Sequence, residues 1–279
     1  MSLQGGKGMK CRICGRMSKK IFSTKLLYKY DANYYYCEKC GFLQTEEPFW
    51  LKEAYSNALT CYDTGVLERN MYFMKALTVF IYKYLDVKGK YLDYAGGYGI
   101  LTRLMRDRGF DFYWNDKYAE NMLAKGFEWD GKSKIEAITS FESFEHFVNP
   151  IEEIENLLKI SRTIIFSTDV LPEEKIPAPN EWWYYALEGG QHIAFYSHKT
   201  FIYIAEKYNL NYYCILGMHI LTDKKVKRLK CGKLMQKISD KWNLLYTYTR
   251  VCHKLKVNKK TMSDMTLLLK KNREVENNI

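Results

Sequence analysis

The stretch that decides the fold is Tyr91-Leu92-Asp93-Tyr94-Ala95-Gly96-Gly97-Tyr98-Gly99. It predicts a strand that ends in an acid, then a glycine-rich loop, then a helix that begins at Ile100. Glycine has no Cβ and tolerates positive φ, so such a loop lets the backbone approach a ligand closely. After the first strand of an open parallel sheet, this is where nucleotides bind. The sequence therefore predicts an α/β domain with a nucleotide site.

The residues that follow the loop restrict the kind of nucleotide. A dinucleotide fingerprint requires a third glycine that allows close helix–strand packing, and Thr102 stands in its place. The Gly-Lys-Ser/Thr sequence of a phosphate loop is absent. Asp93 would also repel a pyrophosphate. A nucleoside joined to a zwitterionic amino acid fits better, because it has no phosphate and carries an ammonium that a carboxylate can hold.

A second acid lies at the end of the next predicted strand, residues 110–116. That acid, Asp116, is placed to accept hydrogen bonds from both ribose hydroxyls. A simpler interpretation is that Asp93 and Asp116 are strand-end acids that cap their own loops. Both interpretations remain open from the sequence.

At these residues the chain resembles the class I S-adenosylmethionine-dependent methyltransferases. Their first motif, hydrophobic-Leu-Asp-x-Gly-x-Gly-x-Gly, matches residues 91–99 except at Ala95, which replaces the first glycine. Residues 144–150, Phe-Glu-His-Phe-Val-Asn-Pro, resemble the signature of the subgroup that includes ubiquinone-pathway and sugar methyltransferases. The resemblance covers about residues 89–213. It implies a Rossmann-like, seven-stranded, mostly parallel sheet flanked by helices, with S-adenosylmethionine as cofactor.

The resemblance also implies which residues bind this cofactor. The Asp93 end of the loop is expected at the methionine part and Asp116 at the ribose. Arg69 lies in a segment that covers the cofactor in relatives, where it could pair with the carboxylate; an exposed arginine is the alternative. The expected cofactor-binding residues are Asp93, Ala95, Gly96, Gly97, Gly99, Asp116, Phe141 and Arg69.

Two Cys-x-x-Cys-Gly motifs lie near the N-terminus. They place Cys11, Cys14, Cys37 and Cys40 as four candidate ligands. Two intervening residues let both thiolates of a pair face one metal ion, and four thiolates form the closed tetrahedral site of structural zinc. A redox motif would need one such pair beside a βαβ unit, so two matched pairs favour metal. The sequence predicts a zinc-ribbon module.

A long aromatic-rich segment, residues 172–197, follows residues 162–168, which are predicted to be the fifth strand. Loops beyond the carboxyl ends of sheet strands often carry function. His192 is the candidate catalytic base or substrate contact, because imidazole titrates near neutral pH. A buried histidine that bonds the backbone is the competing interpretation.

The positive charge is concentrated at the C-terminal end. Residues 220–279 carry 16 basic and five acidic side chains, so they account for the whole net charge of +11. Residues 223–260 are predicted to be a basic helical insertion before a seventh, antiparallel strand at residues 263–269. Such a segment suits an anionic membrane surface or nucleic acid. A solvated helical pair packed beside the sheet is the alternative.

The predicted organisation has five parts. These are a leader or disordered stretch (1–8), the zinc ribbon (9–47), a helical linker or cap (48–88), the methyltransferase domain (89–271) and a tail (272–279). No transmembrane run or signal peptide is recognised. Eight cysteines without a secretory signal favour a reducing compartment, so a cytoplasmic location is expected.

The expected function is S-adenosylmethionine-dependent methylation of a small molecule, with a nucleotide-linked sugar or glycan precursor as the favoured acceptor. An RNA methyltransferase that uses the zinc module and the basic segment is an alternative. The Asn/Asp-Pro-Pro-Tyr motif of base-amino methylation is absent, and residues 141–144 stand in its position, which disfavours RNA. A non-catalytic binding scaffold is the other alternative.

Overall fold

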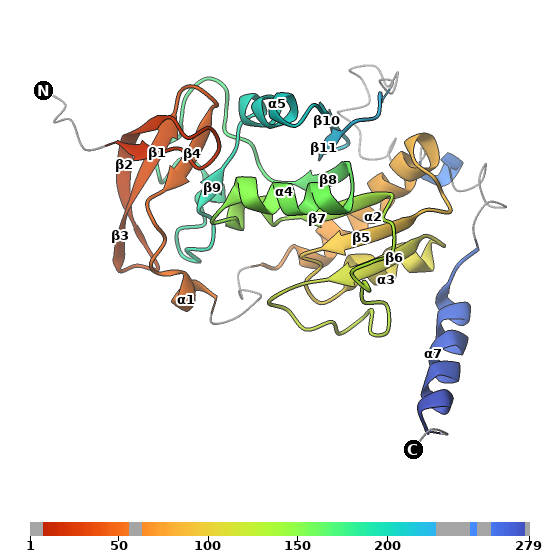
Figure 1. The fold of residues 1–279 in the computed structure, drawn as a ribbon. Helices are drawn as coiled ribbons and strands as arrows, with labels where there is room; N and C mark the ends of the chain where they lie inside the picture. The colour runs from red at the N-terminus through yellow and green to blue at the C-terminus, as the bar shows by residue number, and fades with distance from the viewer. Residues whose placement is uncertain (1–7, 56–62, 227–245, 250–257, 277–279) are drawn as a thin grey trace, which may run out of the picture. The chain divides into compact units, whose positions relative to one another are not determined.

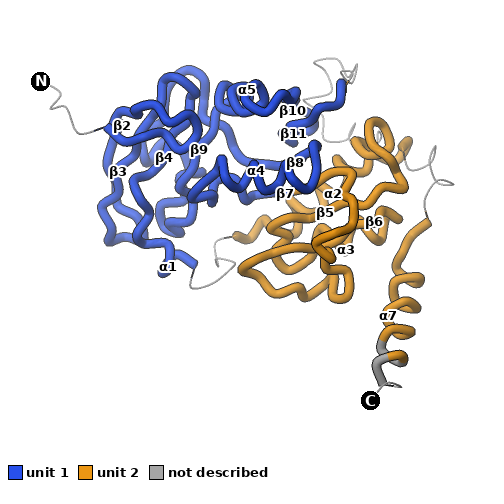
Figure 2. The backbone as a smooth tube through the Cα atoms, in the orientation of Figure 1, with its two compact units in different colours: residues 1–61, 140–225 blue, residues 62–139, 226–279 orange. Residues whose placement is uncertain are grey.

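The computed structural model describes residues 8–55, 63–226, 246–249 and 258–276. The chain divides into two compact units, residues 1–61 with 140–225 and residues 62–139 with 226–279 (Figure 2). The strands are β1 (Met9–Lys10), β2 (Met17–Leu26), β3 (Tyr30–Cys37), β4 (Phe42–Thr45), β5 (Lys90–Tyr94), β6 (Asp111–Asn115), β7 (Ala137–Phe141), β8 (Thr163–Ser167), β9 (Ala194–Phe195), β10 (Asn211–Ile215) and β11 (Met218–Thr222). The helices are α1 (Leu51–Ala54), α2 (Val66–Tyr84), α3 (Ile100–Asp107), η1 (Phe144–His146), α4 (Pro150–Ile160), η2 (Trp183–Tyr185), α5 (His198–Lys207) and α7 (Thr261–Glu276).

One sheet has the strand order β10-β11-β8-β7-β5-β6 (Figure 1). β5 runs parallel to β6 and to β7, whereas β11 runs antiparallel to β8 and to β10. The predicted α/β class is confirmed. The predicted seven strands are not: among the described residues this sheet has six, and its pairing is mixed.

The predicted seventh strand, residues 263–269, is wrong, because these residues lie inside helix α7. The run Leu267-Leu268-Leu269 favours strand as well as helix, and tertiary contacts decide between them. Asp264 is buried, and Leu268 four residues later lies against Gly126. A spacing of four places both side chains on the same face of a helix.

The antiparallel pair of the sheet comes from a hairpin that the sequence did not predict. β10 turns directly into β11 through Leu216 and Gly217, which have φ of 61° and 66°. Two consecutive residues with positive φ form the tight turn that matches strand twist. Leucine is an uncommon residue at the first of these positions, so the turn carries no Asn-Gly or Asp-Gly signature. Among the described residues β11 is the last strand of this sheet along the chain, and most of the predicted insertion, residues 223–260, lies outside the described residues.

Residues 126–129 make a single parallel bridge to β6, between Trp114 and Glu128. Trp114 donates its backbone N–H to the Phe127 carbonyl at 2.8 Å and accepts from the Trp129 N–H at 2.9 Å. The segment therefore lies beside β6, but it is too short to count as a strand.

A second sheet has the strand order β1-β2-β3-β4-β9 (Figure 1). Cys37 ends β3, and the other three N-terminal cysteines lie in the turns between the strands of this sheet. Its printed strand pairs are antiparallel. The last strand comes from the long segment after β8: Ala194 pairs with Gln44 and Phe195 with Leu43. The sheet therefore extends beyond the predicted 9–47 segment and fixes residues 194–195 to it.

The core of this unit is aromatic. Trp50 is 1% exposed and donates its indole N–H to the Gly190 carbonyl at 2.8 Å. Tyr184 and Tyr185, from the Trp-Trp-Tyr-Tyr run, are also buried in this cluster. These aromatic residues therefore fill a core, and Trp183 alone among the four is largely exposed.

Helix α2 lies within residues 48–88, the segment expected to be a helical linker or cap. Its buried apolar residues are Phe73, Met74, Ala76, Leu77, Val79, Phe80 and Ile81. In the part of the chain that the structure describes, no helix combines the length and apolar character needed to cross a membrane.

Helix α7 is anchored in its unit by one buried ion pair. Arg106 of α3 donates to Asp264 with Nε at 2.8 Å and with Nη2 at 2.8 Å. The two side chains are 4% and 5% exposed. The guanidinium also donates to the Phe112 carbonyl at 2.8 Å and lies 3.7 Å from the Phe127 ring centroid. A bidentate, nearly buried pair of this kind is sensitive to the loss of either partner.

We expect Asp264→Ala to lower the free energy of unfolding by about 3 kcal/mol, because a buried guanidinium loses its main counter-charge. The measurement is urea denaturation followed by circular dichroism. Glu274→Ala is the matched control on the same helix, since its pair with Lys270 is exposed and should contribute less than about 1 kcal/mol. Equal losses in both variants would contradict the anchoring role of Asp264.

Candidate functional site

The glycine-rich loop joins β5 to α3 and has several residues with positive φ. They are Ala95 at 55°, Gly97 at 53° and Gly99 at 82°. Gly96 is needed for a different reason: a Cβ there would lie 2.9 Å from the Asp93 carboxylate and 2.9 Å from the Trp114 ring. Ala95 occupies a backbone region that side chains with a Cβ rarely adopt, so the motif's missing first glycine leaves local strain.

Asp93 lies behind this loop. It is 3% exposed, and its two oxygens accept hydrogen bonds from Thr102 at 2.9 Å and Thr139 at 3.0 Å. Burial raises the pKa of Asp93 to about 6, and the threonine hydrogen bonds oppose this only in part. Thr102, which argued against a dinucleotide, thus has a positive role that the sequence did not reveal.

Asp116 holds the loop from its other side. Oδ2 accepts the Gly97 N–H at 2.9 Å, and Oδ1 accepts the N–H groups of Tyr118 at 2.7 Å and Ala119 at 2.8 Å. The Trp114 indole N–H adds a hydrogen bond to the Gly97 carbonyl at 2.8 Å. The structure thus brings Asp93, Asp116 and the loop together in one unit. The loop-capping interpretation is observed directly for Asp116, whereas Asp93 bonds to Thr102 of α3 and Thr139 of β7.

The structure pairs Arg69 with an acid of its own chain. The Nη2 group lies 2.6 Å and 2.8 Å from the two carboxylate oxygens of Asp63, and the side chain is about one-third exposed. A cofactor carboxylate would have to compete with Asp63 for this guanidinium. Phe141 is the last residue of β7 and is partly buried. It belongs to the other unit, which contains residues 140–225.

Beyond β7, the chain places Glu145 and His146 in helix η1, close to His192 of the long segment after β8. One ligand atom from each of the three lies within 4.8 Å of the others. The two imidazole rings are 5.0 Å apart and nearly perpendicular, at 82°. The sequence singled out His192 but not its partnership with Glu145. No sequence spacing could have shown it, because Glu145 and His192 are 47 positions apart in the chain (192 − 145).

The hydrogen bonds of the two histidines fix their tautomers. Nδ1 of His146 lies 3.1 Å from the Gln191 carbonyl, and Nδ1 of His192 lies 2.7 Å from the Tyr184 carbonyl. A carbonyl only accepts, so Nδ1 of each ring carries a proton. Burial lowers the pKa of His146 to about 4, so that ring is neutral at physiological pH.

Glu145 is fully buried, at 0% exposure. Neither of its carboxylate oxygens has a partner in hydrogen-bonding geometry among the described residues. The nearby Thr168 and Tyr184 hydroxyls bond to one another at 2.9 Å. Burial raises the pKa of Glu145 to about 7, and the nearby hydroxyls of Tyr184 and Thr168 oppose this in part. A carboxyl in this state titrates near neutrality, as groups at functional sites often do.

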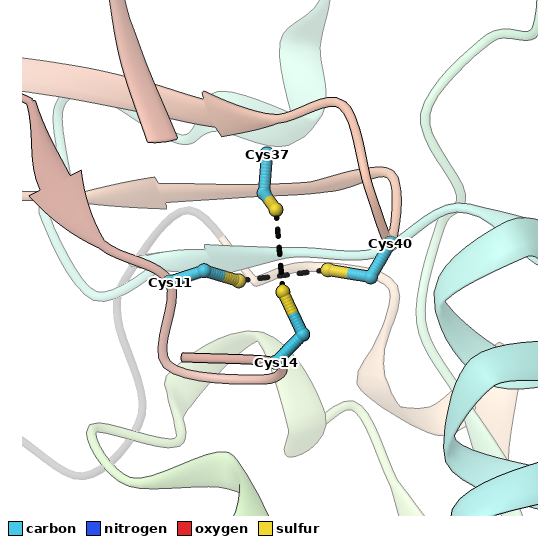
Figure 3. Close-up of side chains that lie close together, drawn as sticks. All are labelled: Cys11, Cys14, Cys37 and Cys40. Carbon is cyan, nitrogen blue, oxygen red and sulfur yellow. Dashed lines mark hydrogen bonds between the residues drawn. The ribbon is translucent and has the colours of Figure 1, made fainter. Parts of the chain in front are cut away.

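The four cysteines converge as the motif spacing predicts (Figure 3). The Sγ atoms of Cys11 and Cys40 lie 3.5 Å apart, and those of Cys14 and Cys37 lie 3.4 Å apart. None of the four is in a disulfide. The set has the donor chemistry and the closed arrangement of a structural tetrathiolate site.

The glycine after each cysteine pair is required by the turn. Gly15 and Gly41 both have φ of 71°, and each donates its N–H to the carbonyl of the first cysteine in its pair, at 2.9 Å and 2.8 Å. A Cβ on Gly41 would also lie 2.3 Å from the Ser197 hydroxyl, beside the N-terminus of α5. The turn at each Cys-x-x-Cys-Gly motif therefore depends on glycine for its shape.

Comparison with known proteins identifies the family. A family model described as "Methyltransferase domain" matches residues 66–215. No curated protein matches the sequence. Similar solved structures include magnesium protoporphyrin IX methyltransferase from Synechocystis PCC 6803 with bound SAM, at 15% identity, covering 61% of this chain and 87% of that one, with a TM-score of 0.37.

Two further structures have comparable likeness. An O-methyltransferase family protein from Burkholderia thailandensis is 12% identical over 62% of this chain and 66% of its own, with a TM-score of 0.40. TnmH is 10% identical over 62% and 60%, with a TM-score of 0.44. Scores this low assign no function. The family model, by contrast, matches more than half of the 279 residues, and the matched span contains the glycine-rich loop of residues 95–99 together with Asp93 and Asp116. The chain therefore belongs to the methyltransferase-domain family.

Proposed function

We propose that this protein is an S-adenosylmethionine-dependent methyltransferase that acts on a small molecule. The observation that carries the proposal is the loop of residues 95–99, held between Asp93 and Asp116 inside the span that matches the family. The loop has no phosphate-binding lysine and is backed by two carboxylates. This electrostatic setting suits a cationic, phosphate-free nucleoside better than a dinucleotide.

The chain's own residues would contribute binding and alignment. Asp116 has acceptor capacity left on Oδ2 for a ribose hydroxyl, because each oxygen offers two lone pairs and Oδ2 accepts only the Gly97 N–H, whereas Oδ1 already accepts two N–H groups. Asp93 supplies negative charge behind the methionine end of the loop. The bound cofactor would supply a methyl group on a sulfonium, which is already activated toward nucleophiles. Holding the acceptor in line with it is worth about 7–11 kcal/mol.

His192 is the candidate residue for taking a proton from the acceptor. Its Nδ1–H donates to the Tyr184 carbonyl, which fixes the orientation of the ring. Such a base matters where the nucleophile must lose a proton, as a hydroxyl does. A nucleotide-linked sugar or glycan precursor remains the favoured acceptor class. The basic segment 223–260, proposed to contact an anionic surface or nucleic acid, lies largely outside the described residues.

The direct test is isothermal titration calorimetry with S-adenosylmethionine, followed by transfer of a radiolabelled methyl group to sugar nucleotides, glycans and RNA. We expect saturable binding and labelling of a small molecule. Absence of binding at millimolar cofactor would support the non-catalytic scaffold instead. Labelling of RNA alone would support the RNA methyltransferase alternative.

Gly96→Ala should weaken cofactor binding at least about tenfold, because its Cβ would force the loop away from Asp93 and Trp114. Gly189→Ala is the matched control: like Gly96 it lacks a positive φ, but a Cβ there would meet only the Ala186 carbonyl, at an ordinary contact distance of 3.6 Å. The two dissociation constants are compared by calorimetry. An equal loss of affinity in both variants would contradict the role of the close contact at Gly96.

Cofactor affinity should depend on pH through Asp93. Its carboxylate must be ionised to attract an ammonium, and burial raises its pKa to about 6. The dissociation constant should therefore be constant above this pH and rise by up to about tenfold per unit below it. Asp93→Asn should bind weakly with no such dependence, whereas the exposed acid variant Asp31→Asn should behave as wild type. A flat wild-type profile between pH 5 and 7.5 would remove Asp93 from ammonium binding.

We propose that Cys11, Cys14, Cys37 and Cys40 hold structural zinc. Chelation of the metal from reduced protein should lower the thermal midpoint of the unit that contains β1–β4, because metal binding contributes directly to folding there. Elemental analysis and differential scanning calorimetry check this. Cys214→Ser, at an exposed cysteine outside the cluster, is the control and should retain full metal content. Retention of zinc by Cys40→Ser at wild-type affinity would contradict the site.

A further inference from the structure

We infer that Thr102 and Thr139 are positioning residues of the cofactor site. Together they hold the Asp93 carboxylate in one orientation behind the glycine-rich loop, as a fixed negative charge that selects a ligand with an ammonium group. The inference rests on the proposed function, because it assigns the residues that support Asp93 in that site. Neither threonine has to touch the cofactor, since each acts through Asp93. All three residues lie in the unit that contains residues 62–139.

The two hydroxyls reach the carboxylate from different elements of the fold. Thr102 of α3 donates to Oδ2 of Asp93 at 2.9 Å, and Thr139 of β7 donates to Oδ1 at 3.0 Å. Both threonines are 0% exposed. One donor on each oxygen, from two separate elements, restricts rotation of the carboxylate about its last single bond. The helix and the strand therefore set the orientation of this group, and the loop in front of it does not have to.

The carboxylate lies directly against the loop that it serves. A Cβ on Gly96 would stand 2.9 Å from Oδ2 of Asp93, so the backbone meets the charge with no side chain between them. A buried charge acts through a medium less polar than water, and salt screens it less than a surface charge. An ammonium group bound on the loop is attracted by Asp93, and a phosphate is repelled.

The charged neighbours of Asp93 do not take over the role of the hydroxyls. Both arginines of α3, Arg103 and Arg106, donate to Asp264 instead. Asp116, at the end of β6, is a like charge and raises the pKa of Asp93 slightly. Burial raises this pKa most, whereas the hydrogen bonds from the two threonines lower it. Loss of either hydroxyl should therefore favour the protonated, uncharged form.

Thr102 also contributes to the choice between kinds of nucleotide. It stands where a dinucleotide fingerprint has its third glycine. A hydroxyl at this position keeps a carboxylate ionised behind the loop, and negative charge there disfavours a pyrophosphate. A single residue thus replaces a feature of dinucleotide sites with a feature that suits an amino-acid ammonium.

The test compares two ligands by calorimetry between about pH 5 and pH 8. S-adenosylhomocysteine carries the ammonium, whereas methylthioadenosine lacks the whole amino-acid part. In wild type, affinity for S-adenosylhomocysteine should fall below about pH 6. In Thr102→Val and Thr139→Val the fall should begin about one pH unit higher, and the double variant should bind this ligand about tenfold more weakly at neutral pH. Affinity for methylthioadenosine should be the same in all of them.

The controls separate positioning from a purely structural role. Thr102→Ser and Thr139→Ser keep a hydroxyl and should restore the wild-type pH profile. Thr78→Val is the matched control, because Thr78 is also 0% exposed but donates to the Met74 carbonyl within α2 at 2.7 Å. Equal loss of both ligands in the valine variants would overturn the inference. So would a pH profile for S-adenosylhomocysteine that the valine substitutions leave unchanged.

Failure of the proposed function gives a different result. A wild-type protein that binds neither ligand would contradict the function, whereas wild-type binding with unaltered valine variants would contradict only this inference. Carbon-13 NMR of labelled aspartate carboxyl groups in the ligand-free protein is a second readout. The Asp93 signal, assigned by its absence in Asp93→Asn, should titrate at higher pH in Thr102→Val and Thr139→Val. A midpoint that stays at its wild-type pH in both variants would overturn the role of the hydroxyls.

Discussion

At Gly96 the backbone lies so close to the Asp93 carboxylate and the Trp114 ring that a Cβ would stand 2.9 Å from each. This contact brings the ends of β5 and β6 against the loop between β5 and α3. It also explains why the strain of a positive φ at Ala95 is tolerated: the residues on both sides are held by other contacts. The nucleotide site that the loop would form depends on this close approach.

The two acids at the strand ends serve the loop in different ways. Asp116 is partly exposed and accepts three backbone N–H groups, so it orders the loop and still faces solvent. Asp93 is buried and accepts two threonine hydroxyls, so it supplies charge from behind. Capping and ligand binding are therefore compatible roles, because a carboxylate oxygen offers more than one lone pair. The same hydrogen bonds that fix the loop would orient both carboxylates for a cofactor.

In the other unit, pairing of β9 with β4 has the comparable organising role. It ties the segment after β8 to the sheet that carries the cysteines. The backbone just before β9 then meets helix η1: Ile193 donates to the Glu145 carbonyl at 2.9 Å, and Gln191 accepts from His146. His192 lies between these two contacts. The Glu145–His146–His192 cluster thus follows from backbone pairing.

The sequence by itself determined the local features: the glycine loop, the strand-end acids, both Cys-x-x-Cys-Gly turns and the apolar face of α2. Each depends on residues close in the chain, where spacing alone dictates geometry. It could not decide the fate of residues 263–269, because a leucine run suits a strand or a helix, and the distant Arg106 selects the helix by binding Asp264. Nor could it foresee β9, the Leu216–Gly217 turn, or Glu145 beside His192. These depend on contacts between residues far apart in the chain, and only the tertiary structure brings such residues together.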